Sequence, residues 1–228
     1  MSFDVRQTWV VIPAYDEDAV LDAVLAEVCG RGYSVVVVDD GSRVPAASFV
    51  TQPVHLLRHC VNLGQGAALQ TGIDYALARG AEFLVTFDSD GQHAAEEIAR
   101  LLAPLRRGDA DVALGTRFAP GGRAVDIAPS RALTLRLATL LTRLTTGLDI
   151  TDTHNGFRAL EANAARRLRI TQNRMAHGSQ ILEEIAALGL RYVEVPVTIR
   201  YTEHSLKKGQ KLSNAFNILW ESLSQRLF

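Results

Sequence analysis

Short apolar segments alternate with helical patterns along the first half of this chain, and this alternation restricts its fold more than any other feature. Runs of apolar and β-branched residues occupy residues 8–12, 34–38, 54–57, 83–87 and 112–115. Apolar residues at helical spacing fill the intervals, over residues 16–30, 64–79 and 94–105. Because strands that alternate with helices form mostly parallel sheets covered on both faces, the sequence predicts an α/β protein.

The second half of the chain is organised differently. The loop Pro120–Gly122 precedes residues 130–146, where leucines and arginines at helical spacing predict a helix. Residues 192–201 predict a strand, and residues 213–227 predict a final amphipathic helix. The length of 228 residues suits one domain, so we expect a single unit over residues 1–228.

Polar clusters follow three of the predicted strands at the point where each strand ends. These clusters are Tyr15–Glu17, Asp39–Ser42 and Asp88–Gln92. The carboxyl ends of parallel strands meet at one edge of a sheet, and ligands of open α/β sheets bind there. We therefore expect the three clusters to lie around one binding site.

The cluster that begins at Asp88 has the composition of a metal site. Asp88 and Asp90 are separated by one residue after a buried strand, and Gln92 can add an amide oxygen. Mg²⁺ and Mn²⁺ prefer oxygen ligands and usually share them with substrate phosphates. The pattern predicts a divalent cation at these acids, and the alternative is a polar turn that caps the next helix.

The glycine-containing segments around Asp40 and Gly64 indicate a nucleotide site less strongly than the acids do. Asp40 can accept hydrogen bonds from a nucleobase or a ribose hydroxyl, but Asp-Gly is also an ordinary turn dipeptide. Gly64-Gln65-Gly66 is a poor dinucleotide fingerprint, because Leu69 occupies the place of the third glycine. The chain also lacks a phosphate-loop lysine motif, so a nicotinamide enzyme or an ATPase is disfavoured.

Charge and hydropathy exclude several classes of protein. The formal net charge of −1 argues against a nucleic-acid binder, which is usually strongly basic. No segment approaches the ~20 apolar residues that span a bilayer, and the N-terminus has no signal-peptide core. Cys29 and Cys60 match no zinc or redox spacing. We expect a cytoplasmic protein that is soluble or peripheral to the membrane.

Taken together, five short motifs resemble the inverting glycosyltransferases of family 2, which have the GT-A fold. The motifs are Val11–Glu17, Val38–Ser42, Asn62–Gly66, Asp88–His93 and Gly115–Arg117. Within that family the chain is similar to the dolichyl- and undecaprenyl-phosphate sugar synthases. The resemblance implies a nucleotide-sugar half over residues 1–117 and an acceptor half over residues 118–228. It covers nearly the whole chain.

The resemblance also implies roles for individual residues. Pro13, Tyr15 and Glu17 match the turn that contacts the nucleoside, and Val38 and Asp40 match residues at the base and ribose. The motif Asp88, Ser89, Asp90 and Gln92 matches the ligands of the metal and the diphosphate. Arg117 matches an arginine near the phosphates, and Arg131 matches an arginine that meets the lipid phosphate. Asp152 matches an acidic motif beside the acceptor, although a plain turn residue is the alternative. Asp90, Arg117 and Asp152 are the expected catalytic residues.

The expected reaction is inverting transfer of a sugar from a GDP-, UDP- or dTDP-linked donor to a polyprenyl phosphate, with Mg²⁺ or Mn²⁺ as cofactor. Two alternatives remain open. The acceptor can instead be a hydroxyl of a growing glycan, for which Asp152 would be the base, or the chain can be a non-catalytic nucleotide-binding module. A nucleotidyltransferase is disfavoured, because Pro13–Glu17 is acidic rather than basic and glycine-rich.

The C-terminal segment carries the expectations about the membrane. Related synthases have a basic lid that ends in Gly-x-Ser-Lys, whereas this chain has a different basic segment from Arg200 to Lys211. We expect a basic residue of this segment to close over the diphosphate, with Arg200 and Lys211 as the candidates. Phe216, Leu219, Trp220, Leu223 and Leu227 form one apolar stripe of the final helix. This stripe can lie in a membrane surface, or it can pack on the protein's own core or on a second subunit.

Overall fold

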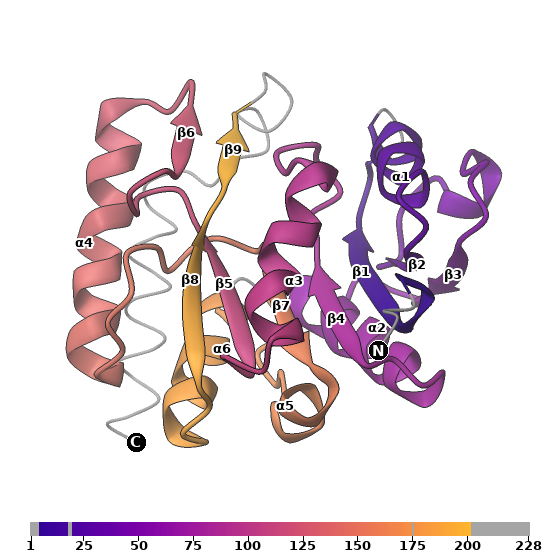
Figure 1. Ribbon diagram of the computed structural model, residues 1–228. Coiled ribbons are helices and arrows are strands. Elements are labelled where there is room, and N and C mark those ends of the chain that lie inside the picture. The colour runs from indigo at the N-terminus through magenta and orange to yellow at the C-terminus, as the bar shows by residue number, and fades with distance from the viewer. Residues whose placement is uncertain (1–4, 18–19, 175, 202–228) are drawn as a thin grey trace.

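The computed structural model describes residues 5–17, 20–174 and 176–201, and it contains a seven-stranded sheet with the order β3-β2-β1-β4-β7-β5-β8 (Figure 1). The strands are β1 (Thr8–Ala14), β2 (Ser34–Asp39), β3 (His55–Arg58), β4 (Phe83–Thr86), β5 (Val112–Thr116), β7 (Arg158–Glu161) and β8 (Tyr192–Pro196). Only β7 runs antiparallel to its neighbours in this sheet. A separate pair, β6 (Arg123–Val125) and β9 (Thr198–Arg200), is parallel.

Helices cover both faces of the large sheet and bury one apolar cluster on each. One cluster packs α1 (Leu21–Cys29) and α3 (Ile98–Arg106) on the sheet, and the other packs α2 (Gln65–Ala78), α5 (Ala162–Arg167) and α6 (His177–Ala187). Alternate residues of β1 supply the two clusters, with Val10 and Ile12 on one face and Trp9 and Val11 on the other. The fold is thus the predicted α/β arrangement.

Helix α4 (Pro129–Thr146) lies apart at the side of the molecule, beyond β8 (Figure 1). Among its residues only Ala138 and Thr139 are buried. The remaining described helical segments are short 3₁₀ turns, which are Val5–Gln7, Ala46–Ser48 and Ala95–Glu97. No helix of the described residues is long and apolar enough to cross a bilayer.

The five strands predicted in the first half are confirmed to within two residues at each end. The sequence did not predict β6, β7, α5 or α6. The single strand predicted over residues 192–201 is in fact two strands. That segment divides at Val197, because β8 pairs with β5 whereas β9 pairs with β6. Strand β7 escaped notice because Arg158–Glu161 reads Arg-Ala-Leu-Glu, a composition that favours helix.

The predicted start of the first helix was also wrong. Asp16 was expected in its first turn, but α1 begins at Leu21 and Asp16 has a left-handed backbone with φ 52°. The Asp16 carboxylate instead accepts hydrogen bonds from the backbone and the side chain of Arg43. The predicted final helix, over residues 213–227, lies outside the described residues.

Gly64 and Gly66 allow the two halves of the chain to touch at the start of α2. The carbonyl oxygen of Asn173 accepts hydrogen bonds from the backbone N–H groups of Gly66 at 2.8 Å and Ala67 at 3.4 Å. A Cβ atom on Gly66 would lie 2.1 Å from the carbonyl oxygen of Gln172. The helix N-terminus is therefore capped by protein carbonyls rather than left free for a phosphate.

We expect Gly66→Ala to destabilise the protein by about 1–3 kcal/mol, because the added methyl group collides with backbone rather than with a flexible side chain. Gly178→Ala is the matched control, since Gly178 also lies in the first turn of a helix but has open space around its Cβ position. Urea unfolding followed by circular dichroism measures both changes. Equal stability of the two variants would contradict the close-approach interpretation.

Candidate active site

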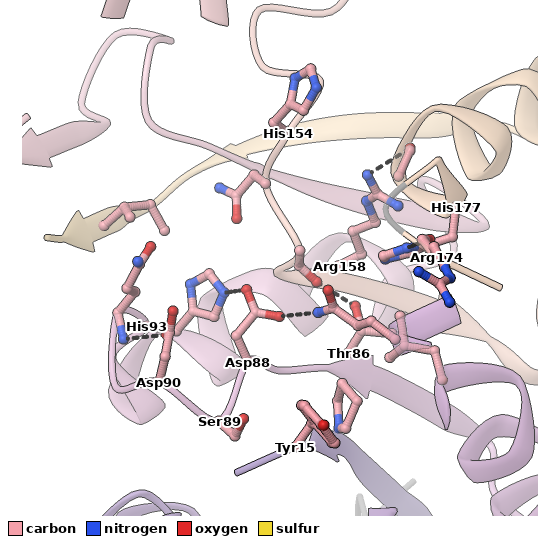
Figure 2. A pocket seen from close by; sticks show the side chains of 18 of the residues that line it. Tyr15, Thr86, Asp88, Ser89, Asp90, His93, His154, Arg158, Arg174 and His177 are labelled. Carbon is pink, nitrogen blue, oxygen red and sulfur yellow. Dashed lines mark hydrogen bonds and ion pairs between the residues drawn. The ribbon is translucent and has the colours of Figure 1, made fainter. Parts of the chain in front are cut away.

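The carboxyl ends of the central strands surround a cavity of about 640 Å³ (Figure 2). The chain leaves β1 in one direction along the sheet and reaches β4 in the other, so the cavity opens at the topological switch point between them. The lining brings together these predicted residues from both halves of the chain: Pro13, Tyr15, Glu17, Asp40, Asp88, Ser89, Asp90, Gln92, Arg117 and Arg131.

Asp88 occupies the centre of this cavity and is held by neighbours from three directions. Its Oδ1 atom accepts a hydrogen bond from Gln65 Nε2 at 3.1 Å, and its Oδ2 atom lies 2.9 Å from His93 Nε2. A Cβ atom on Gly156 would lie 2.8 Å from Oδ2, so only glycine lets that loop approach the carboxylate. Figure 2 shows both interactions of Asp88 as dashed lines.

The electrostatics of the two acids differ. Burial and, to a smaller extent, the negative charge of Asp88 together raise the pKa of Asp90 to about 6. Burial also raises the pKa of Asp88, but the hydrogen bond and charge of His93 outweigh burial and hold it below the ordinary value. Two ionised carboxylates this close repel each other, and a bound cation would compensate their charge.

The donor set therefore fits a hard divalent cation. Asp88 and Asp90 supply carboxylate oxygens, and Gln92 supplies an amide at the same rim of the cavity. Within residues 5–17, 20–174 and 176–201, no group of three or more His, Cys, Asp or Glu side chains comes together as a metal cluster. An ion held by this pair would need further oxygens, which water or substrate phosphates can provide.

We expect Asp90→Asn to stabilise the metal-free protein at about pH 7.5 by roughly 1–3 kcal/mol, because it removes an ionised carboxylate that burial disfavours. The folded-state pKa is raised from 3.8 to about 6, so this penalty develops as pH rises through that window. Thermal unfolding in EDTA measures the effect.

The stabilisation from Asp90→Asn should shrink toward pH 4, because the carboxyl is then protonated in the folded protein and partly protonated in the unfolded chain, so little of the penalty of a buried charge remains. Asp109→Asn is the control, because the Asp109 side chain is 54% exposed and pairs with Arg107 at the surface. A gain that is equally large at both pH values would contradict the assigned cause.

A buried ion pair forms a second part of the site. Arg117 Nε donates to Asp152 Oδ2 at 2.6 Å, and Arg117 Nη1 donates to the hydroxyl of Tyr201. Burial lowers the pKa of Arg117, but Asp152 and Tyr201 outweigh it and hold the pKa above the ordinary value. The Asp152 side chain is fully buried and is not part of the cavity lining, so its contact is with Arg117 rather than with the open cavity.

Arg131 is placed differently from Arg117, although both line the cavity. It lies in the first turn of α4, and its guanidinium stacks over the ring of Tyr201 at 5.0 Å from the centroid. Among the described residues Arg131 has no carboxylate within salt-bridge distance. An arginine whose charge is not balanced by an acid can bind a phosphate with its planar fork.

Two predicted site residues, Val38 and Arg200, are not part of the cavity lining, and a third, Asp40, lines the cavity but has its carboxylate engaged within the protein. The side chain of Val38 is fully buried in the core and does not line the cavity. The Asp40 carboxylate accepts hydrogen bonds from the backbone N–H groups of Leu63 and Gly64 and contacts His59 Nδ1 at 2.7 Å. Arg200 is exposed and contributes only its backbone, which donates to Gln92, whereas Lys211 lies outside the described residues.

The structure adds cavity residues that the sequence analysis did not select: Gln65, His93, Arg158, Arg174 and His177. Gln65 and His93 were visible beside the glycines and acids of the motifs. The other three come from the second half, where no local pattern connects them with Asp88. Burial lowers the pKa of Arg158 to about 10, and its Nη2 donates to the carbonyl oxygens of Thr153 and Gly178.

Residues 9–169 match the family model described as glycosyl transferase family 2. The chain belongs to this family. In this glycosyltransferase of family 2, the acids at the switch point and several arginines line one cavity. The seven-stranded sheet is accordingly that of the GT-A fold.

Three relatives illustrate the range of similar proteins. A polyprenol monophosphomannose synthase of Mycolicibacterium smegmatis is 32% identical over 88% of this chain and 79% of the relative. An undecaprenyl-phosphate mannosyltransferase of Micrococcus luteus is 33% identical over 82% of this chain and 81% of the relative. A UDP-N-acetylglucosamine–dolichyl-phosphate N-acetylglucosaminyltransferase of Methanococcus voltae is 26% identical over 96% of each chain.

Solved structures agree with the fold. Glucosyl-3-phosphoglycerate synthase from Mycobacterium tuberculosis, crystallised with Mn²⁺ and UDP-glucose, matches with a TM-score of 0.73 and 17% identity. The match covers 97% of this chain and 78% of that chain. At this identity the likeness establishes the shared architecture alone.

Proposed function

We propose that this glycosyltransferase moves a sugar from a nucleotide sugar to a polyprenyl phosphate, with inversion at the anomeric carbon. The observation that carries the proposal is the placement of charge in one cavity. A carboxylate pair lies at the carboxyl end of β4, and Arg131 of α4, which has no salt-bridge partner among the described residues, lines the same cavity. The names of the three relatives, which include polyprenol, undecaprenyl and dolichyl phosphates, support this choice of acceptor.

The donor belongs at the acidic side of the cavity. Pro13, Tyr15 and Glu17 line the end of the cavity next to β1, where the nucleoside would bind. Asp88, Asp90 and Gln92 would hold Mg²⁺ or Mn²⁺, which neutralises the charge of the departing nucleoside diphosphate as a Lewis acid. The UDP and Mn²⁺ named with the solved structure of similar fold support this assignment.

The acceptor belongs at the side of Arg131. A phosphate oxygen of the lipid attacks the anomeric carbon, the bond to the diphosphate oxygen breaks, and the nucleoside diphosphate leaves with the electron pair. Because that phosphate is already anionic, the reaction needs no strong general base. Asp152, the candidate base for a hydroxyl acceptor, is buried and paired with Arg117, and this favours the phosphate.

We expect Arg131→Ala to raise the KM for polyprenyl phosphate by about tenfold or more, with little change in the KM for the nucleotide sugar, because a charged hydrogen bond to phosphate is lost. Arg143→Ala is the matched control on the same helix, since Arg143 pairs with Asp149 and does not line the cavity. Steady-state transfer of radiolabelled sugar to undecaprenyl phosphate measures both constants.

The same assay tests the proposed reaction itself. Purified protein should form a sugar-phosphate lipid from a GDP-, UDP- or dTDP-sugar with Mn²⁺, and EDTA should abolish the product. Transfer to a glycan hydroxyl but never to the lipid phosphate would replace the proposal with the hydroxyl alternative. Equal effects of Arg131→Ala on both substrates would remove its role at the acceptor.

The exposed side of α4 supports a peripheral position on the membrane. Leucines form a stripe that faces solvent, with exposed fractions from 41% to 75%: Leu133, Leu137, Leu140, Leu141 and Leu144. The helix carries three arginines and no acidic residue, which suits anionic headgroups. Its opposite side, including Arg131 and Leu135, lines the cavity, so α4 would lie between the membrane surface and the site.

We expect the combined change Leu137→Gln, Leu140→Gln and Leu144→Gln to reduce co-sedimentation with anionic liposomes by about tenfold or more, because three apolar side chains no longer enter the interface. Val44→Gln with Val61→Gln is the control, since both valines are at least half exposed but lie on the other half of the chain. Circular dichroism verifies the fold of each variant. Unchanged sedimentation of the leucine variant would contradict a membrane role for α4.

A further inference from the structure

A recess of the cavity remains without a function after the donor and the acceptor have been placed. It lies on the side of Asp88 opposite His93, and its walls are Gln65 and Leu69 of α2, Arg174, and His177 and Ile181 of α6. In Figure 2, His177 and Arg174 appear across the pocket from His93 and Asp90, and Asp88 lies between them. Neither Gln65 nor His177 was selected from the sequence.

The hydrogen bonding of His177 determines which ring nitrogen carries its proton. His177 Nδ1 lies 2.7 Å from the carbonyl oxygen of Arg174, and a carbonyl can only accept, so Nδ1 is protonated. Burial and the charge of Arg158 lower the pKa of His177, against the opposing effect of that hydrogen bond. The imidazole is therefore neutral, and Nε2 offers a lone pair on a side chain that lines the cavity.

A hydrogen bond also fixes the orientation of the Gln65 side-chain amide. Its amide nitrogen donates to Asp88 Oδ1 at 3.1 Å, which leaves Oε1 as a second acceptor beside the recess. Arg174 contributes hydrogen-bond donors at the rim, and Leu69 and Ile181 provide an apolar wall. Fixed acceptors, a donor and an apolar surface together are suited to a sugar ring, which has hydroxyl groups at its edge and C–H groups on its faces.

We propose that this recess is the subsite for the donor's sugar ring, with His177 Nε2 and Gln65 Oε1 accepting hydrogen bonds from its hydroxyl groups. The inference rests on the proposed function, which places the diphosphate at Asp88 and Asp90. A sugar attached to that diphosphate must lie next to Asp88, and Gln65 is one hydrogen bond away from it. His177 is then a specificity-determining residue for the donor.

The test compares binding of a nucleotide sugar with binding of the nucleoside diphosphate alone. Titration calorimetry with Mn²⁺ gives dissociation constants for UDP, UDP-glucose, GDP and GDP-mannose, and the pair that the wild type binds more tightly is used. His177→Asn retains a nitrogen that can donate to the carbonyl of Arg174 but lacks the Nε2 acceptor. His55→Asn is the matched control, because His55 is exposed on β3 and is outside the cavity.

We expect His177→Asn to weaken binding of the nucleotide sugar by about tenfold, the loss of one hydrogen bond, with no change for the nucleoside diphosphate. His177→Gln, whose longer amide reaches toward the Nε2 position, should recover part of the loss. Unchanged melting temperatures exclude a folding defect, and a variant that fails to fold is replaced by His177→Ser, which also lacks the Nε2 acceptor and for which the same selective loss is expected.

Each other outcome overturns the proposal in a different way. Equal weakening of both ligands, or of Mn²⁺ binding measured alone, would make His177 a ligand of the diphosphate or the metal. No effect on either ligand would leave the recess outside the sugar site. Failure of the wild type to bind any of the four nucleotides, and also dTDP and dTDP-glucose titrated in the same way, would instead overturn the proposed function on which the inference rests.

Discussion

Three segments that line the cavity contact the carboxylate of Asp88. It follows β4 at the switch point of the sheet, contacts Gln65 of α2 and His93, and lies against the backbone of Gly156. Burying this carboxylate is unfavourable in itself, and the interaction with His93 outweighs that cost. Because the two halves of the chain converge on one charged group, a change at Asp88 would alter both halves together.

Two of the arginines that line the cavity, Arg117 and Arg131, differ in how their charge is balanced. Asp152 balances the charge of Arg117 in a buried pair, and such a pair fixes geometry more than it adds stability. Arg131 has no comparable acidic partner among the described residues and is held by the ring of Tyr201. Tyr201 contacts both arginines, since its hydroxyl accepts a hydrogen bond from Arg117 and its ring lies under the guanidinium of Arg131.

The join between α2 and the segment before α6 gives the cavity its third wall. Gly64 and Gly66 allow backbone to approach the start of α2, and the carbonyl of Asn173 caps the helix that a nucleotide fold of another type would use for phosphate. Gln180 strengthens the join, since its side chain bonds to the backbone of Arg169, Thr171 and Gln172. This arrangement agrees with the proposal that the acids after β4, rather than the start of α2, recognise the diphosphate.

The sequence by itself determined the parallel strands of the first half, the polar clusters at their ends and the pairing of Asp88 with Asp90. These features depend on local patterns of period two and 3.6 and on motifs a few residues long. Cavity placement of Asp88, Asp90, Arg117 and Arg131 agrees with that analysis, although their roles remain predictions. Val38 shows its limit, because a residue beside a motif can still point into the core.

Only the tertiary structure decided the contribution of the second half. Strand β7 enters the sheet as Arg-Ala-Leu-Glu because its neighbours β4 and β5 bury it, and no local propensity indicates this. Asp152 became a buried partner of Arg117 across 35 residues of chain, and His177 reached the cavity through the docking of α6. Hydrogen bonds and burial between distant segments assign these roles, and a one-dimensional pattern does not record which segments meet.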